Sequence, residues 1–107
     1  MKKEVKEYTI EGYTIKELYY KDSEGKYYNG GRIDRIEVER PKRKFLPEID
    51  VNLNLLSEKL EITDIRIKTT VCGYLPVNEV KEVIKGYQKA VKVVNKLQEI
   101  YKSYICK

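Results

Sequence analysis

The 107-residue sequence contains no histidine, and this absence excludes much of enzyme chemistry. Histidine is the commonest general base, the usual activator of serine and cysteine nucleophiles, and the commonest transition-metal ligand. The two cysteines, Cys72 and Cys106, lie far apart in the chain and do not form a zinc-binding motif. Without a histidine to activate it, Cys72 is interpreted as a structural thiol. We therefore predict a protein that is not an enzyme and has no catalytic residue, metal site or cofactor.

The sequence also lacks a long apolar run. No stretch reaches the roughly 18 apolar residues that indicate a membrane-spanning helix. The first residues, Met1 to Val5, contain a basic pair with no apolar segment behind it, so no signal peptide is expected. Two cysteines fit a reducing compartment. We expect a single domain in the cytoplasm.

Charge is plentiful and unevenly placed. Charged residues make up 36% of the chain, and the formal net charge is +5. Residues 26–44 and residues 78–107 each carry seven basic and three acidic side chains. The positive potential is therefore expected over these two segments.

The first part of the chain has the alternation of β-strands. Strands are predicted at 5–10 and 13–20 with a bend at Gly12, at 26–28, and at 33–39, where Pro41 ends the last one. Asp22 to Gly25 has the composition of a turn, and Gly25 stands where a positive φ is needed. Asn29-Gly30-Gly31 interrupts the strand pattern.

A hairpin is predicted over residues 48–71. Apolar and polar residues alternate on both sides of a short turn at 57–59, and the phase slips at Thr63-Asp64, which predicts a one-residue bulge there. This register gives two apolar and two charged cross-strand pairs: Leu53 with Ile62, Val51 with Ile65, Asp50 with Arg66, and Glu48 with Lys68. A hard-cation site or a carboxylate pair on the face of Glu48, Asp50, Asn52 and Asn54 is the alternative, but the register already pairs the two carboxylates with Lys68 and Arg66.

From residue 78 to 105 the apolar period changes to that of a helix. Asn78 is predicted as its N-cap, and Gly86 is expected off the apolar stripe, at a cost of roughly 1 kcal/mol in helix propensity. The opposite face carries five lysines: Lys81, Lys85, Lys89, Lys92 and Lys96. The predicted fold is α+β, a four- to five-stranded antiparallel sheet over 4–71 with one long C-terminal amphipathic α-helix packed on one face.

The predicted helix is longer than the strands, so its last turns are expected to overhang the sheet. Those turns are apolar, and an exposed apolar end favours a partner. We therefore predict a homodimer through five residues: Leu97, Ile100, Tyr101, Tyr104 and Ile105.

The basic loop Arg40-Pro41-Lys42-Arg43-Lys44 is the strongest candidate binding feature. Four of the five arginines lie within twelve residues: Arg32, Arg35, Arg40 and Arg43. The guanidinium fork suits phosphate or carboxylate, so we expect an anionic partner, either nucleic acid, a nucleotide or an acidic protein surface. The alternatives are a solvated connection between strands, attraction to a membrane surface, and a targeting signal.

The loop from Tyr27 to Arg32 is a second candidate. Tyr27 and Tyr28 precede a glycine pair that can expose backbone N–H groups to an anion, and tyrosine can stack on bases. The spacing is not that of a P-loop. A bulged hairpin is the structural alternative. The ten tyrosines of the chain are divided between core positions and a recognition surface.

Three segments resemble small uncharacterised proteins carried by phages and prophages of Gram-positive bacteria. They are Leu46-Pro47-Glu48-Ile49, residues 67–75, and residues 82–91. The resemblance implies an accessory protein, with anti-CRISPR inhibitors of host defence as one possibility. Its partner would be a host defence or nucleic-acid-binding protein in the host cytoplasm. Many such inhibitors imitate DNA with an acidic surface, whereas this chain is basic.

These observations predict a non-enzymatic binding protein, a phage-type inhibitor that engages an anionic partner through its basic loop. Two alternatives stay open. One is a small nucleic-acid-binding protein without an inhibitory role, and the other is a structural protein that oligomerises through its helix.

Overall fold

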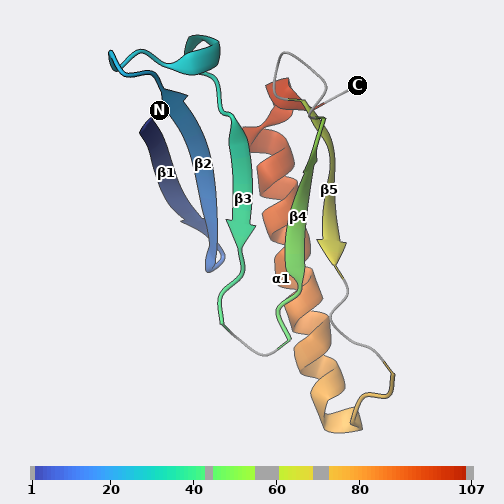
Figure 1. Ribbon diagram of the computed structural model, residues 1–107. Helices are drawn as coiled ribbons and strands as arrows, with labels where there is room; N and C mark the ends of the chain where they lie inside the picture. The colour runs from blue at the N-terminus through green and yellow to red at the C-terminus, as the bar shows by residue number, and fades with distance from the viewer. Residues whose placement is uncertain (1, 43–44, 55–60, 69–72, 106–107) are drawn as a thin grey trace.

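The computed structural model describes residues 2–42, 45–54, 61–68 and 73–105. The described residues form five strands and one α-helix, the α+β arrangement expected from the sequence (Figure 1). The strands are β1 (Lys2–Ile10), β2 (Tyr13–Lys21), β3 (Arg35–Glu39), β4 (Glu48–Leu53) and β5 (Ile62–Lys68), and the helix is α1 (Val80–Ile100). Three short 3-10 helices occupy Tyr28–Gly31, Val77–Glu79 and Lys102–Tyr104.

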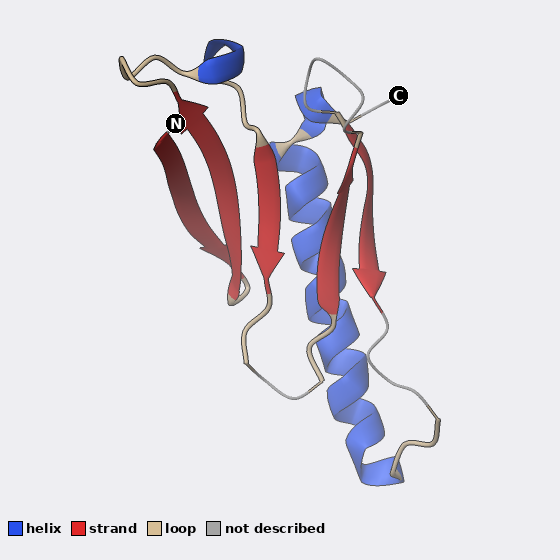
Figure 2. Cartoon of the chain, viewed as in Figure 1, coloured by secondary structure: helices blue, strands red, loops and turns tan. Residues whose placement is uncertain are grey.

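The strands divide into two antiparallel sheets where one was expected. The first has the order β1-β2-β3 and the second pairs β4 with β5 (Figure 2). In the described chain, no backbone hydrogen bond joins β3 to β4. In Figure 1 the helix runs behind β4 and behind the gap between β3 and β4, where the two sheets meet. The buried core contains residues from all three parts: Ile15, Ile36, Ile49, Ile62, Ala90, Val93 and Leu97.

The predicted 48–71 hairpin is confirmed where it is described. Leu53 pairs with Ile62 and Val51 with Ile65, and the register shifts beside Leu53, which leaves Thr63 as the extra residue of the bulge. On the other face Asp50 accepts a hydrogen bond from Arg66 at 2.9 Å, and Glu48 lies 3.7 Å from the Lys68 ammonium. The turn at 57–59 lies outside the described residues. The register could be predicted because the apolar pairs on one face of the hairpin and the charged pairs on the other require the same alignment.

The hairpin of β1 and β2 closes at the expected bend. Ile10 pairs with Tyr13, so only two residues form the turn. Both have positive φ, 50° at Glu11 and 84° at Gly12. This is the backbone of a two-residue turn whose twist matches that of the strands.

The strand and bulged hairpin expected at 26–32 are wrong. Tyr27 forms only an isolated bridge with Lys21, and a 3-10 turn follows. The carboxylate Oδ1 of Asp22 accepts hydrogen bonds from the backbone N–H groups of Glu24 and Lys26, both at 2.9 Å. These bonds form the predicted turn, whereas the positive φ of Gly30 (68°) and Gly31 (83°) keeps the following residues out of an extended strand. The positive φ predicted for Gly25 is confirmed at 83°.

Two details of the helix differ from expectation. Asn78 is not an N-cap, because residues 77–79 form a 3-10 turn and α1 begins after Glu79 without a side-chain capping bond. Gly86 does not lie off the packed face, since it is buried. A Cβ atom there would lie 2.0 Å from the carbonyl oxygen of Phe45. The glycine therefore allows the helix and the chain before β4 to approach each other closely.

The expected overhang occurs at the other end of the helix. The first turns of α1 extend beyond the strands, and its C-terminal turns lie beside them (Figure 1). Leu97 and Tyr101 are fully buried, and Tyr104 and Ile105 pack partly against the core. Of the five residues predicted for oligomerisation, Ile100 is the one classed as exposed. In the described residues, no helix has the length and apolar character needed to span a membrane.

Candidate binding surfaces

The predicted basic residues that the structure describes lie at two ends of β3. Arg32 precedes this strand and Arg35 begins it, whereas Arg40 and Lys42 follow its end. A five-residue strand is roughly 17 Å long, so the two loops are separated by the length of β3. The described arginines are therefore close together in the sequence but do not form one patch on the surface.

Arg40 has a structural contact. Its Nη1 donates a hydrogen bond to the backbone oxygen of Leu46 at 3.1 Å, which ties β3 to the segment before β4. Lys42 is exposed, and Arg43 and Lys44 lie outside the described residues. The anion-binding role of this loop stays a prediction.

The ring of Tyr27 is engaged within the chain. Its hydroxyl donates a hydrogen bond to the carboxylate of Glu4 at 2.7 Å, and the Lys21 ammonium lies 4.6 Å from the ring centre. The edge of the Tyr19 ring is also close, with ring centres 6.1 Å apart. The hydrogen bond from Tyr27 and the nearby Lys21 lower the pKa of Glu4. These contacts reduce the ring surface that is available for stacking on a base. The side chain of Tyr28 lies outside the described residues.

A tyrosine network links the end of α1 to the first sheet. Glu17 on β2 accepts hydrogen bonds from the hydroxyls of Tyr19 and Tyr101, and the Tyr101 hydroxyl lies 2.6 Å from that of Tyr8. Burial and the neighbouring Glu17 carboxylate raise the pKa of both Tyr19 and Tyr101. These tyrosines are therefore neutral and structural. The sequence pattern did not predict this network, because its members are distant in the chain.

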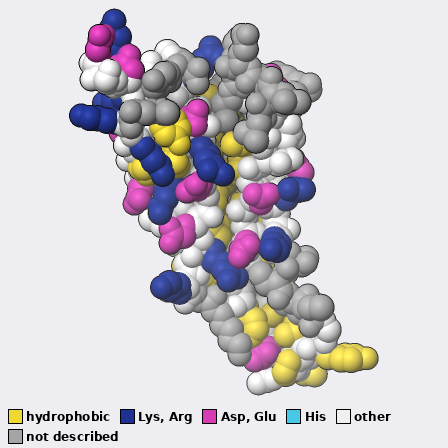
Figure 3. Space-filling model, in the orientation of Figure 1, with side chains coloured by type: hydrophobic (Ala, Val, Ile, Leu, Met, Phe, Trp, Pro, Cys, Tyr) yellow, Lys and Arg dark blue, Asp and Glu magenta, His cyan; other side chains and the backbone are white. Residues whose placement is uncertain are grey.

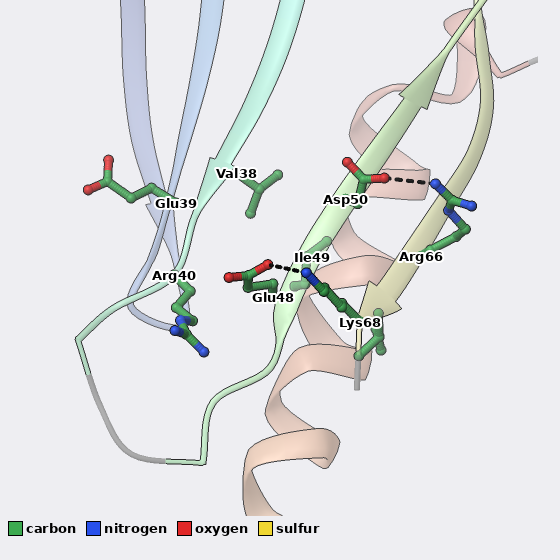
Figure 4. Close-up of a pocket in the computed structure, with 9 residues that line it drawn as sticks. Val38, Glu39, Arg40, Glu48, Ile49, Asp50, Arg66 and Lys68 are labelled. Atoms are coloured by element: carbon green, nitrogen blue, oxygen red, sulfur yellow. Dashed lines mark hydrogen bonds and ion pairs between the residues drawn. The ribbon is translucent and has the colours of Figure 1, made fainter. Parts of the chain in front are cut away.

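A hollow of about 870 Å³ opens between β3 and β4 (Figure 4). Its apolar lining comes from three residues: Val38, Ile49 and Ile67. Its charged lining consists of three cations and three anions: Arg40, Arg66, Lys68, Glu39, Glu48 and Asp50.

The charges of this hollow are largely paired. Figure 4 shows Asp50 joined to Arg66 and Glu48 joined to Lys68. Glu39 lies 2.9 Å from the ammonium of Lys16, and this ion pair lowers the pKa of the Glu39 carboxyl. A charge-balanced hollow has little attraction for a polyanion. Its mixed lining is closer in chemistry to a protein surface.

A positive surface lies along α1. It is called the lysine face and is defined as Lys81, Lys85, Lys89, Lys92 and Lys96. Four of these side chains are exposed, and Lys89 is half-buried. Lys85 lies 3.6 Å from Glu82, whereas the other four form no ion pair with any residue that the structure describes. From residue 81 to 96 the helix rises roughly 22 Å. The face is therefore a line of cations with little internal neutralisation.

The described residues contain no cluster of three or more Asp, Glu, His or Cys side chains that would hold a metal ion. Cys72 and Cys106 lie outside these residues. Comparisons with protein-family models, curated proteins and solved structures found no match to this chain. The resemblance to phage accessory proteins stays a prediction, and function has to be argued from the surfaces themselves.

Proposed function

We propose that this chain is a non-enzymatic protein that binds nucleic acid through the lysine face of α1. The observation that carries the proposal is the line of five lysines, four of them without an ion-pair partner among the described residues. The hollow between the sheets, by contrast, has its charges paired. A linear polyanion is the ligand that such a line of cations attracts.

The expected binding mode follows from the chemistry of lysine. Residues three and four apart on a helix are roughly 5–6 Å apart, so the lysine face can follow a phosphate backbone. Lysine contacts phosphate as a point charge and does not read bases in the way that a paired donor does. We therefore expect binding with little sequence preference and a strong dependence on salt. If all five lysines met phosphates of a duplex, the slope of log K against log salt would approach about −4.5.

The test compares three triple variants with the wild type by fluorescence anisotropy. The labelled ligands are single-stranded DNA, duplex DNA and RNA, each at two salt concentrations. The first variant removes three unpaired lysines of the helix: Lys81→Gln, Lys92→Gln and Lys96→Gln. The second neutralises the basic loop: Lys42→Gln, Arg43→Gln and Lys44→Gln. The third is a control at exposed lysines elsewhere: Lys2→Gln, Lys3→Gln and Lys26→Gln.

Each variant lowers the net charge of +5 by three, so only the position of the lost charge differs. We expect the helix variant alone to lose most of its affinity and its salt dependence. If the loop variant alone loses affinity, the binding site is the loop predicted from the sequence. Equal losses in all three would indicate attraction to net charge without a site. A wild type that does not bind at low salt would refute the proposal.

An inhibitor of a host defence protein is the second candidate function. The observation that favours it is the charge-balanced hollow between β3 and β4, which suits a protein surface better than a polyanion. This function predicts that the tagged chain retains one host protein at a fixed stoichiometry, and that the variant Arg66→Ala weakens this retention. If the variant retains the host protein as well as the wild type does, the hollow is not the binding site.

A further inference from the structure

The helix α1 has two rows of apolar side chains, one buried in the core and one partly exposed. The packed row consists of Val83, Gly86, Ala90, Val93 and Leu97, all buried. The second row, called the outer seam, consists of Val80, Ile84, Tyr87, Val91 and Val94. It lies about a quarter of a turn around the helix from the packed row. The exposed fractions are 38% for Val80, 50% for Ile84 and 47% for Val91.

The spacing of the outer seam is that of a helix-pairing surface. Its members are separated alternately by four and three positions, which is the heptad repeat of helices that pack along their length. β-Branched residues occupy four of its five positions. A solvent-facing helix side would ordinarily be polar, so this row has the composition of an interface.

The apolar surface continues beyond the seam at the start of the helix. Val77 and Tyr74 precede Val80, and both are almost fully exposed, Val77 at 88%. Figure 3 shows apolar side chains gathered at this end of the molecule, where the helix extends past the strands. The seam and this end together form a surface along roughly 25 Å of helix. Three seam members, Val80, Ile84 and Val91, are exposed on this surface, whereas Tyr87 and Val94 are half-buried and Val94 packs against the core.

The polar residues beside the outer seam point to a second copy of this chain as the occupant. Along its solvent side lie Gln88 and Asn95, and Gln98 continues the heptad pattern at the next position. All three are uncharged amides that can hydrogen-bond to the same residues in another copy. Four lysines of the lysine face lie farther around the helix from the seam than these amides do: Lys85, Lys89, Lys92 and Lys96. The fifth, Lys81, lies at the N-terminal end of the seam. A chain with a net charge of +5 can therefore meet an identical chain here without a row of like charges in contact.

We propose that the protein forms a homodimer in which the outer seams of two α1 helices pack against each other. The same surface serves both copies, so the interface is closed and self-complementary. The dimer would hold two lysine faces on one particle. The dimer does not depend on the proposed nucleic-acid binding, and each can fail without the other. The position of the seam also differs from the C-terminal helix end, where Leu97 and Tyr101 are already buried in the core.

The test is the molar mass in solution as a function of protein concentration, by sedimentation equilibrium. The seam variant Ile84→Gln with Val91→Gln replaces two half-exposed members by polar residues. The matched control, Lys85→Gln with Lys92→Gln, changes the neighbouring position in each case, on the lysine face. All four positions are exposed, so both variants should keep the far-ultraviolet circular dichroism of the wild type.

We expect the wild-type mass to rise from 12.7 kDa towards twice that value with concentration. The seam variant should stay monomeric over the same range, and the control should dimerise as well as the wild type or better. A wild type that stays monomeric at its highest soluble concentration overturns the proposal, whatever the variants do. A seam variant that dimerises like the wild type also overturns it, because the interface would then lie elsewhere.

Discussion

Gly86→Ala should destabilise this protein by about 2 kcal/mol, although alanine is the better helix former by roughly 1 kcal/mol. The reason is the approach of the Phe45 carbonyl oxygen, which would lie 2.0 Å from the new methyl carbon, with the Phe45 carbonyl carbon at 3.1 Å. Both atoms belong to the backbone, so no side chain can rotate away. The helix and the segment before β4 would have to separate by more than an ångström. Overpacking of this kind lowers the free energy of unfolding by about 1–3 kcal/mol. We expect a cost of about 3 kcal/mol here, and the gain of roughly 1 kcal/mol in helix propensity reduces it to the net loss of about 2 kcal/mol.

The measurement is urea unfolding followed by the circular dichroism of the helix. The matched control is Glu99→Ala, an exposed position of the same helix, which should change the stability by no more than a few tenths of a kcal/mol. A loss of 2 kcal/mol would also lower the melting temperature by roughly 8–16 °C. If Gly86→Ala is as stable as the wild type or more stable, the close approach of the helix to Phe45 does not exist in solution.

Two further predictions concern the tyrosine network. Tyr101→Phe removes the hydroxyl that donates a hydrogen bond to Glu17 and is hydrogen-bonded to Tyr8. The free energy of unfolding should fall by about 1–3 kcal/mol, because the half-buried Glu17 carboxylate loses a donor. An unchanged urea midpoint would contradict this. Stability should also fall as the pH rises above about 10, the ordinary tyrosine pKa. The folded state raises the pKa of Tyr19 and Tyr101 and so keeps protons that the unfolded chain releases. Urea midpoints across this pH range test the sign, and a free energy of unfolding that does not fall above about pH 10 would contradict the prediction.

The elements of secondary structure were predictable where local pattern and cross-strand pattern agreed. The β4-β5 register could be predicted because Val51 with Ile65 and Asp50 with Arg66 required the same alignment on opposite faces. The strand prediction for 26–32 was wrong because Gly30 and Gly31 adopt positive φ, and a β-propensity scale does not show which glycines leave the extended region. The prediction of Asn78 as the N-cap was wrong because the chain enters the helix through a 3-10 turn.

The candidate surfaces were less predictable than the elements. Arg32 and Arg35 are separated from Arg40 by β3, although the three are close together in the sequence. The lysine face of α1 could be predicted, since five lysines at helical spacing define it without any tertiary contact. The division of the wide apolar stripe into a packed row and an outer seam could not be predicted, because it depends on which side of the helix the strands cover.

By itself, the sequence determined the α+β class, the long helix with its lysine face, the β4-β5 register with its bulge, and the turn residues. All of these depend on period, propensity and neighbours in the chain. Only the tertiary structure decided that the strands form two sheets, that Gly86 is a contact point, that tyrosines gather around Glu17, and that the helix overhangs at its beginning. These features depend on the distance between segments far apart in the chain, and such distances are set by how the whole core packs.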